Sequence, residues 1–386
     1  MQVKQIYSII NSAAKQAFGA TAVEAQDLTG LIAMGDTVLS TATTKDAFLN
    51  VLVDRIAKTI IQSKVYSGKT RKVLMDTFSY GAAVQKTYTE PEEASKNDAW
   101  DIQEGAELGP GTIHLPTVKV KIFENHDTWK YTVCIPDYQM DTAFTSESEM
   151  ASFITSIYNS VETSMNLALE NMVNLCMANF IAEKLDNQKE VGTGVQAVNL
   201  LDAYNKLTNA GLTVNKCLMD ANFLKFAGKE IKRYIDKFEN ITQIYNTEGY
   251  KRFTPKEDMN VLFLSDYAAA NATYLESDTY HKELVALPGY DTVNYWQGLG
   301  TTGSFADVSK VDLTTSSGKT VKQSGIIGFV FDKDALGVMF DKKKTTSYVD
   351  PDKDVTKIWN KATMGYFNDL SENAIVFYIA EDITED

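Results

Sequence analysis

The sequence predicts an α+β protein, because helical and strand-like patterns occupy separate stretches of its 386 residues. A helical pattern without proline or glycine runs from Glu149 to Leu185. Alternating apolar and polar residues predict strands at 117–135, long strands broken by turns are predicted towards the C-terminus, and helical and strand-like stretches alternate between 200 and 265. A hydrophobic content of 44% is sufficient for a sizeable core.

The first 64 residues contain two helical patterns. Apolar residues recur at spacings of three and four in 2–18, which ends before Gly19, and again in 45–64. The stretch between them, "GATAVEAQDLTGLIAMGDTVLSTATT", is rich in Ala, Thr and Gly. We therefore expect an extended arm there rather than a part of the core.

The period changes to two after Val65. "KVLMDTFSYGAAVQKTY", "TVKVKIF" and "WKYTVCI" are predicted strands with one face exposed. The segment that interrupts them, "TEPEEASKNDAWDIQEGAELGPG", is acidic, almost free of aliphatic residues and ends in a Gly-Pro-Gly turn. It cannot form a core of its own, so it is either disordered or completed by another molecule.

The stretch from Glu149 to Leu185 predicts one long helix, which at ~1.5 Å per residue would exceed roughly 50 Å. Ser146 and Glu149 form a capping-box pattern at its start. Three methionines of this stretch are interpreted as gap-filling core residues rather than as a ligand groove. They are Met165, Met172 and Met177.

The second half of the chain predicts an α/β region followed by long strands. Helical "LLDAYNKLTNAG" and "NFLKFAGKEIKRY" alternate with strand-like "KCLMD" and "NVLFLS", an order that favours a central sheet. Residues 288–325 are rich in turn-forming residues. The last pieces, "GIIGFVFD", "GVMFDKKKTTSYV" and "TKIWNKATMGYFNDLSENAIVFYI", predict long strands separated by turns.

Composition excludes several classes of protein. A formal net charge of −14 disfavours a large phosphate-binding surface, so sequence-specific DNA binding is not expected. No stretch reaches the roughly 18 apolar residues of a membrane span, and Lys4 and Lys15 interrupt the region where a signal peptide would be apolar. The cysteines form no C-x-x-C pair and are interpreted as small buried hydrophobic residues in a reducing compartment. They are Cys134, Cys176 and Cys217.

No motif specifies an active site. "SGKT" occurs at 67–70 and 317–320, but Ser63 and Leu313 stand where a phosphate-binding loop needs its first glycine. His114 and His126 could approach each other across a hairpin, which leaves a hydrolase as an alternative, although hydrogen-bonded or solvent-facing histidines are the simpler interpretation. We therefore predict no enzyme, no cofactor, and no catalytic, cofactor-binding or metal-ligating residue.

One acidic stretch requires a separate explanation. "SYVDPDKDVTKIW" places Asp350, Asp352 and Asp354 at alternate positions, as an EF-hand loop does. The sixth position of that loop must be glycine and the twelfth glutamate, but Val355 and Lys361 stand there. A calcium loop is therefore not expected.

The order of these elements resembles that of the major capsid proteins of tailed bacteriophages, which share the Hong Kong 97 fold. The resemblance covers most of the chain and is closest to short-tailed (podovirus) phages, through "DAFLNVLVDRIAKTIIQSK", "SFITSIYNSVETSMNLALENMVN" and "TKIWNKATMGYFNDLSENAIVFYI". It implies a Hong Kong 97-type capsid fold with five parts. These are an N-terminal arm at 1–64, an E-loop hairpin at 65–136, a P-domain spine helix at 137–190, an α/β A-domain at 191–339 and P-domain terminal strands at 340–386.

The resemblance also implies a function. A protein of this kind self-assembles as pentamers and hexamers into the icosahedral head shell, and the shell encloses double-stranded DNA without sequence-specific binding. A separate scaffolding protein and a portal are the implied partners, with no membrane. The implied location is the virion, after assembly in the host cytoplasm. An encapsulin-like compartment protein of the same fold, which packages enzymes, is the alternative.

In that family the acidic turn lies where three capsomers meet, so copies of Asp350, Asp352 and Asp354 would crowd together and repel one another. Lysines of a neighbour are the implied partners. The candidates are Lys342, Lys343, Lys344 and Lys353. A shared divalent ion is a second alternative, and a solvated acidic turn is the simplest one.

Overall fold

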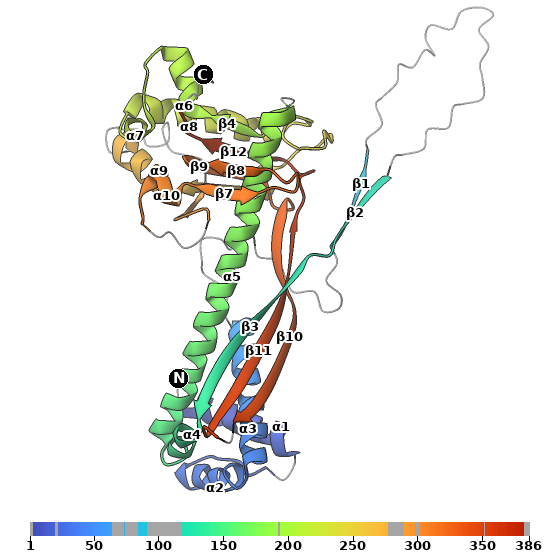
Figure 1. The fold of residues 1–386 in the computed structure, drawn as a ribbon, viewed down its shortest axis with the longest axis vertical. Coiled ribbons are helices and arrows are strands. Elements are labelled where there is room, and N and C mark those ends of the chain that lie inside the picture. Colours follow the sequence, from blue (N-terminus) through green and yellow to red (C-terminus); the bar gives the residue numbers. More distant parts are fainter. Residues whose placement is uncertain are drawn as a thin grey trace, which may run out of the picture. The chain divides into compact units, whose positions relative to one another are not determined.

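The computed structural model describes residues 3–19, 22–63, 73, 84–90, 118–191, 194–276, 289–297, 302–350 and 352–381. The chain divides into two compact units, each built from three segments. Unit 1 comprises 1–82, 126–173 and 338–365, and unit 2 comprises 83–125, 174–337 and 366–386. Helices and strands occur in both units (Figure 1), which confirms the predicted α+β class.

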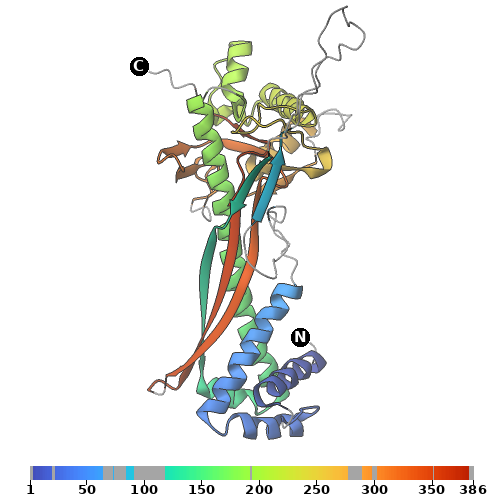
Figure 2. The same ribbon diagram turned by 90° about the vertical axis from the view of Figure 1, so that its right-hand side faces the viewer.

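Unit 1 contains the helices of its N-terminal segment and those of its second segment, 126–173 (Figure 2). They are α1 (Val3–Phe18), α2 (Leu28–Val38), α3 (Ala42–Ser63), α4 (Asp137–Ala143) and the first part of α5 (Glu147–Val191). The predicted helices at 2–18 and 45–64 are confirmed as α1 and α3. Lys45 of α3 forms ion pairs with Asp137 (3.5 Å) and Asp141 (3.1 Å) of α4.

The predicted extended arm between α1 and α3 is wrong, because α2 occupies it. Leu31, Met34 and Val38 follow helical spacing and are buried. The side chain of Asp27 caps the helix by accepting a hydrogen bond from the Gly30 amide (2.8 Å). At Gly35 a Cβ would lie only 2.9 Å from the ring of Phe144, so the Gly and Ala content reflects close packing and not an extended chain.

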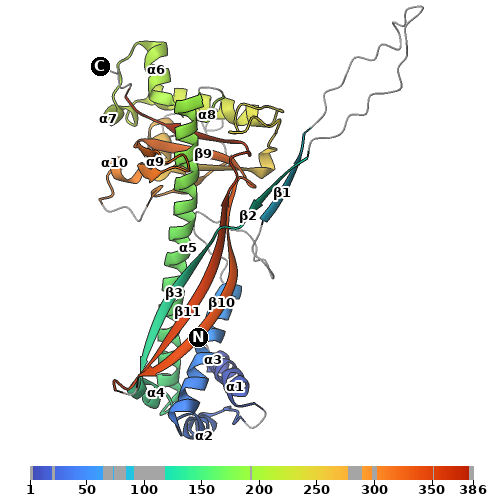
Figure 3. The same ribbon diagram turned by 45° about the vertical axis from the view of Figure 1, so that its right-hand side comes forward.

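The sheet of unit 1 has the strand order β10-β11-β3 (Figure 3), with β3 at His126–Pro136, β10 at Leu336–Asp350 and β11 at Val355–Asn368. Strands β3 and β11 are antiparallel, with Tyr131 opposite Asn360. Tyr131, Val133 and Ile135 are buried on one face of β3, as the alternation predicts. Cys134 lies on the other face and is exposed, so the expectation of a buried cysteine is wrong there; Cys176 and Cys217 are buried.

Helix α5 confirms the predicted long helix and is longer than expected, at 45 residues. The Glu149 amide donates to the Ser146 hydroxyl (3.2 Å), which is half of the predicted capping box. Met165, Met172 and Met177 are buried, as the core interpretation requires. No helix in the described ranges is both long and apolar enough to cross a membrane.

A five-stranded mixed sheet with the order β4-β12-β9-β5-β6 forms the centre of unit 2. The outer pairs β4/β12 and β5/β6 are parallel, while β9 runs antiparallel to both β12 and β5. These strands are β4 (Ala197–Asn199), β5 (Met259–Leu264), β6 (Asp291–Val293), β9 (Ile326–Asp332) and β12 (Ala374–Tyr378). A separate hairpin is formed by β7 (Val311–Thr314) and β8 (Thr320–Gln323).

Helices cover this sheet. The main core joins the sheet to α6 and α8, and Phe180 of α5 packs against Phe329 of β9. The helices are α6 (Leu200–Thr208), α7 (Val214–Cys217), α8 (Ala221–Phe238), η4 (Lys256–Asp258), α9 (Ser265–Asn271), η5 (Ala272–Glu276) and α10 (Phe305–Val308). The strand-like interpretation of "KCLMD" is wrong, because α7 ends there in a helical turn and Cys217 bonds to the carbonyl of Val214.

Candidate functional site at the root of the β1–β2 hairpin

A two-stranded hairpin, β1 (Val84–Thr89) and β2 (Val118–Phe123), belongs to unit 2. The strands are antiparallel, with Lys86 opposite Lys121 and Tyr88 opposite Lys119. Side chains alternate across the sheet, so these four side chains share one face. The remainder of the predicted strand at 72–88 and the acidic segment that follows lie outside the described residues.

The lysine-bearing face of the hairpin meets a loop that follows β11. The Asp369 carboxylate accepts from both the amide and the hydroxyl of Ser371, at 3.1 and 2.6 Å, which closes a tight turn. This turn brings Glu372 to the same side of unit 2 as Asp369, and both carboxylates are almost fully buried, with 1% of Asp369 and 7% of Glu372 exposed. Buried carboxylates require charged or hydrogen-bonded partners.

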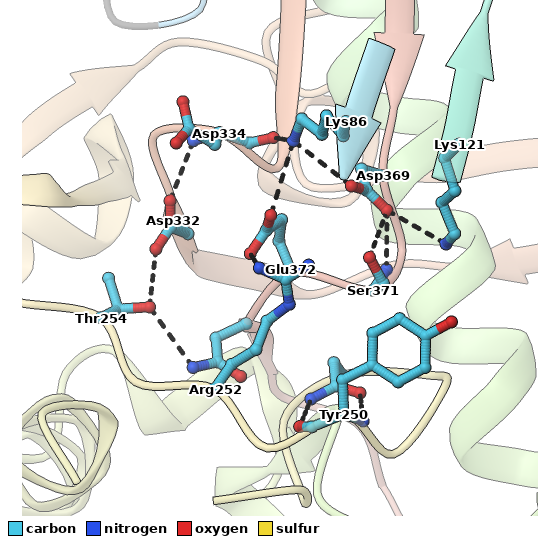
Figure 4. Close-up of polar contacts among 12 residues, drawn as sticks. Lys86, Lys121, Tyr250, Arg252, Thr254, Asp332, Asp334, Asp369, Ser371 and Glu372 are labelled. Atoms are coloured by element: carbon cyan, nitrogen blue, oxygen red, sulfur yellow. Dashed lines mark hydrogen bonds and ion pairs between the residues drawn. The ribbon is translucent and has the colours of Figure 1, made fainter. Parts of the chain in front are cut away.

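The two lysines of the hairpin supply those partners (Figure 4). Lys86 Nζ lies 3.3 Å from Asp369 Oδ2 and 3.6 Å from Glu372 Oε1, and it also donates to the carbonyl of Asp334. Lys121 Nζ lies 3.3 Å from Asp369 Oδ1 and also pairs with Glu248. Each lysine therefore bridges the loop at 369–372 to a second segment of unit 2.

Arginine and threonine complete the cluster from a third segment. Arg252 Nη1 lies 2.9 Å from Glu372 Oε2, and the Thr254 hydroxyl donates to Asp332 Oδ2 at 2.8 Å (Figure 4). We call these charged residues, together with Lys184 of α5, which is described below, the root cluster. Its members are Lys86, Lys121, Lys184, Arg252, Asp332, Asp369 and Glu372.

Burial and the neighbouring cations act in opposite directions on these carboxylates. Burial raises the pKa of Asp369, but the Ser371 hydroxyl, Lys86 and Lys121 together outweigh it and hold the pKa below its usual range. Burial raises the pKa of Glu372, and Arg252 and Lys86 only partly oppose it. The charged form of Asp369 is therefore favoured by both lysines of the hairpin, and that of Glu372 by Arg252 and by Lys86.

Lys184 of α5 lies beneath the same loop. It is fully buried, and its ammonium donates to the carbonyls of Tyr245 (3.2 Å) and Leu370 (3.5 Å). Burial lowers the pKa of Lys184 to about 7, while Asp369 and Glu372 oppose the shift.

Stacked rings add to the ion pairs. Tyr88 of β1 stacks on Tyr250 with ring centroids 4.4 Å apart and planes inclined by 2°. Lys119 lies over the Tyr250 ring at 4.4 Å, and Arg252 lies over the Tyr88 ring at 4.9 Å. Asn246 fixes Tyr250 through two hydrogen bonds to its backbone, at 2.7 and 2.8 Å.

The other face of the hairpin is apolar and exposed. Val118, Val120 and Ile122 are 54, 52 and 59% exposed. The alternation predicts a strand with one exposed face, and in β2 that face is the aliphatic one. The opposite face carries Lys121, which pairs with the buried Asp369, and Lys119, which lies over the Tyr250 ring.

The residues singled out in the acidic turn lie in unit 1. Asp350 ends β10 and forms an ion pair with Lys357 of β11 at 3.2 Å, and this hydrogen bond holds the pKa of Asp350 below its usual range. Asp352 is exposed, and Asp354 has a positive φ of 46° and accepts from the Asp137 amide at 3.0 Å. Thus the structure brings Asp350 to Lys357, a partner that the sequence interpretation missed although its position seven residues later across the turn was a usable signal.

Among the described residues, the ion pair at this turn joins Asp350 to Lys357 and not to one of the candidate lysines. Lys344 is exposed on β10, and Lys353 is exposed in the turn, where its amide donates to the Asp350 carbonyl at 3.4 Å. The backbones of Lys342 and Lys343 lie in β10, which fixes their position in the strand. Their proposed contact with a neighbouring copy stays a prediction.

The histidine and "SGKT" motifs considered above lie as follows in the structure. His126 is exposed at the start of β3, and His114 lies outside the described residues. In the part of the chain that the structure describes, no three His, Cys, Asp or Glu side chains gather as metal ligands do. The second "SGKT" forms the β7–β8 turn, where the Ser317 hydroxyl and the Thr315 hydroxyl donate to Asp186 of α5 at 2.8 and 3.0 Å.

Comparison with solved structures gives the class of fold. A chain in the structure of head fiber and inner core protein gp22 of native bacteriophage P68 matches with a TM-score of 0.50 and 10% identity, over 80% of this chain and 83% of that one. The capsid structure of Staphylococcus phage Andhra matches with a TM-score of 0.49 and 9% identity, over 80% and 83% of the two chains. The match at a TM-score of 0.50 shows that the chain shares its fold with a chain of the bacteriophage P68 structure.

Sequence comparison gives the family. The Phi29-like phage major capsid protein family matches residues 8–378, and the chain belongs to that family. The major capsid protein of Bacillus phage GA-1 is 29% identical over 161 residues, which cover 41% of this chain and 33% of that relative. The major capsid protein of Bacillus phage B103 is 25% identical over 210 residues, or 54% and 46% of the two chains. These matches span less than half of either relative.

Proposed function

We propose that the protein is the structural subunit of a bacteriophage head shell, in which many copies self-assemble into an icosahedral container for the double-stranded DNA genome. Membership of the capsid family over residues 8–378 supports this function. It also favours a phage head over the enzyme-packaging compartment of the same fold. The protein then acts in the virion as a building element without catalysis.

The exposed face of the β1–β2 hairpin is the observation that carries the proposal. Val118, Val120 and Ile122 form an aliphatic row, and the residues beside them on β1 are Gln85, Thr87 and Thr89. An isolated chain gains nothing from holding an aliphatic row in water, since burial of apolar surface stabilises by about 25 cal/mol per Å². A neighbouring copy that covers the row would recover this free energy.

The finer assignments belong to the same proposal. In the terms of the family, the hairpin is part of the E-loop at 65–136 and α5 supplies the spine helix. Strands β4, β5, β6 and β9 fall in the A-domain at 191–339, and β12 falls in the terminal strands at 340–386. Pentamers and hexamers, a separate scaffolding protein, a portal and assembly in the host cytoplasm complete the scheme.

The test is assembly of the purified chain, followed by sedimentation and electron microscopy, with and without replacement of the aliphatic row. Val118→Thr, Val120→Thr and Ile122→Thr together keep β-branched side chains, so strand propensity is retained while the row becomes polar. We expect the wild-type chain to form shells and the triple variant to remain as folded, unassembled protein.

An aliphatic control separates composition from disturbance of the strand. Val120→Ile together with Ile122→Val keeps the row apolar, and shells are expected to form. Wild-type chain that stays monomeric at high concentration with a scaffolding protein present contradicts the proposed function. Shells that contain enzymes in place of nucleic acid would favour the compartment protein.

A further inference from the structure

The root of the β1–β2 hairpin is held by surface contacts. No side chain of β1 or β2 is fully buried: β1 alternates between half-buried and exposed positions, and β2 is exposed at four of its six positions. A two-stranded sheet is only marginally stable alone. The position of this hairpin on unit 2 therefore depends on the root cluster, on the Tyr88–Tyr250 stack and on the contact between Phe123 and Phe367 at 5.5 Å.

The cluster divides its charges between the hairpin and the body of unit 2. The hairpin contributes the cations Lys86 and Lys121, while the body contributes the cations Arg252 and Lys184 and the carboxylates Asp332, Asp369 and Glu372. Withdrawal of the hairpin would remove two of these four cations. It would leave Asp369, the most deeply buried carboxylate, without either of its lysines.

Removal of positive charge makes proton uptake easier for every neighbouring group. Lys86 lowers the pKa of Asp369, Glu372 and Asp332, so all three carboxylates bind protons more readily once the hairpin has left. The same electrostatic argument applies to Lys184, whose pKa Asp369 and Glu372 raise. Its ammonium donates to the carbonyls of Tyr245 and Leu370 and lies 5.5 Å from the ring centroid of Phe180.

We propose that the root cluster is a proton-linked latch in which Lys184 takes up a proton when the hairpin leaves unit 2 and releases it when the hairpin docks. Lys184 is suited to this role by its position, because it is fully buried and donates to the carbonyl of Leu370, a residue that lies between Asp369 and Glu372 in the same loop. Lys86 neutralises the same two carboxylates from the hairpin. The docked hairpin and a protonated Lys184 thus compete to neutralise Asp369 and Glu372.

The direction of the pH effect follows from linkage. The docked state holds Lys184 at a pKa of about 7, and the released state has a higher value because the lysines of the hairpin are gone. The released state therefore binds more protons above about pH 7, and a rise in pH favours docking. At acid pH the carboxylates act in the same direction, since each of them has the higher pKa in the released state.

The latch would regulate the aliphatic row that the proposed function uses in assembly. Only this effect on assembly rests on the proposed function. Docking sets where the row of Val118, Val120 and Ile122 is presented, so assembly would be more efficient at mildly alkaline pH than at acid pH. The docking equilibrium itself is a property of the single chain.

The experiment is amide hydrogen exchange of the unassembled full-length protein between pH 6 and 9, corrected for the intrinsic exchange rate. Peptides that cover 84–89 and 118–123 report on the hairpin, and a peptide from β9 serves as the core reference. We expect hairpin protection to rise roughly tenfold from pH 7 to pH 9, within the limit of tenfold per pH unit for one proton. Protection of β9 should not change.

Three variants sharpen the test. Lys184→Met mimics the neutral lysine and should give high hairpin protection that no longer depends on pH above 7. Glu372→Gln mimics a protonated carboxyl, and should reduce hairpin protection at pH 7 by roughly tenfold. Lys310→Met, which breaks an exposed ion pair with Asp312 (2.9 Å) away from the cluster, should match the wild type.

Wild-type hairpin protection that is equal at pH 7 and pH 9 would overturn the latch, even if shells form and the proposed function stands. A Lys184→Met profile identical to that of the wild type would also overturn it. If Lys184→Met does not fold, unchanged protection in Glu372→Gln overturns it instead. Failure of shell assembly with a normal pH response of the hairpin would contradict the proposed function and leave the latch intact.

Discussion

Asp354 adopts a backbone conformation that most side chains avoid. Its φ of +46° lies in the left-handed region, and its carbonyl accepts a hydrogen bond from the Asp137 amide at 3.0 Å. Aspartate tolerates this region better than alanine, and glycine has no Cβ to clash. We expect Asp354→Ala to lower the free energy of unfolding by about 1 kcal/mol and Asp354→Gly to leave it nearly unchanged. Urea denaturation of the unassembled chain measures both, and equal losses would disprove the role of φ.

Asp350 gives a pH dependence of known sign. The hydrogen bond from Lys357 lowers its pKa in the folded state, so this carboxylate stabilises the fold above its unfolded pKa of about 3.9. That contribution disappears as the pH falls through the lower folded value. We expect Asp350→Asn to unfold more easily at pH 7 and to lose less stability between pH 5 and 2 than the wild type.

Asp352→Asn is the matched control, because Asp352 is exposed in the same turn. Chemical denaturation at several pH values should show a wild-type profile for this variant. If the stability of Asp350→Asn and of the wild type depends on pH in the same way, the ion pair with Lys357 does not contribute to stability.

Among the secondary-structure elements, α2 is a helix where the sequence predicted an extended arm, just as α7 is a helix where it predicted a strand. The cap of α2 is the clearest local signal for that helix, since Asp27 accepts from the Gly30 amide. We expect Asp27→Ala to destabilise the chain by about 1 kcal/mol, the usual effect of losing an N-cap side chain. Asp36→Ala, an exposed change inside the same helix, is the control and should change stability by less than about 0.5 kcal/mol in the same denaturation assay. Equal effects would show that the cap does not determine the helix.

Elements with strong periodicity were predictable, and elements that depend on distant partners were not. α5 and the strand β3 follow patterns that any core would require, and the structure confirms them. β2 has an equally clear alternation, but the sequence does not reveal that its lysines are the bound face. That outcome depends on Asp369 and Glu372, which lie about 250 residues later and reach the hairpin only through the fold.

The root cluster could not be predicted because it forms only when distant segments of the whole chain come together. Unit 2 is assembled from three separate segments of the chain, and the cluster takes at least one charged residue from each of them. Single residues such as Lys86 or Glu372 have no motif around them, and their charge state depends on burial that only the folded unit creates. The capsid family was predictable for the opposite reason, because the order of elements along the chain carries it.

The acidic turn at Asp350–Asp354 is expected to affect the stability of the assembled shell. Asp350 already has Lys357 as a partner within its own chain, so Asp352 and Asp354 are the charges left for neighbouring copies. If three turns meet as the family resemblance implies, the aspartates require lysines of a neighbour, such as Lys344 or Lys353. We expect Asp352→Asn together with Asp354→Asn to lower the melting temperature of shells at low salt. The loss should largely disappear at about 1 M salt, where the screening length falls to ~3 Å. Differential scanning calorimetry of wild-type and variant shells, with and without a chelator, measures this. If a chelator lowers the melting temperature of wild-type shells but not of variant shells, a shared divalent ion neutralises the aspartates in place of the lysines. If melting is unchanged under every condition, the turn is a solvated surface feature.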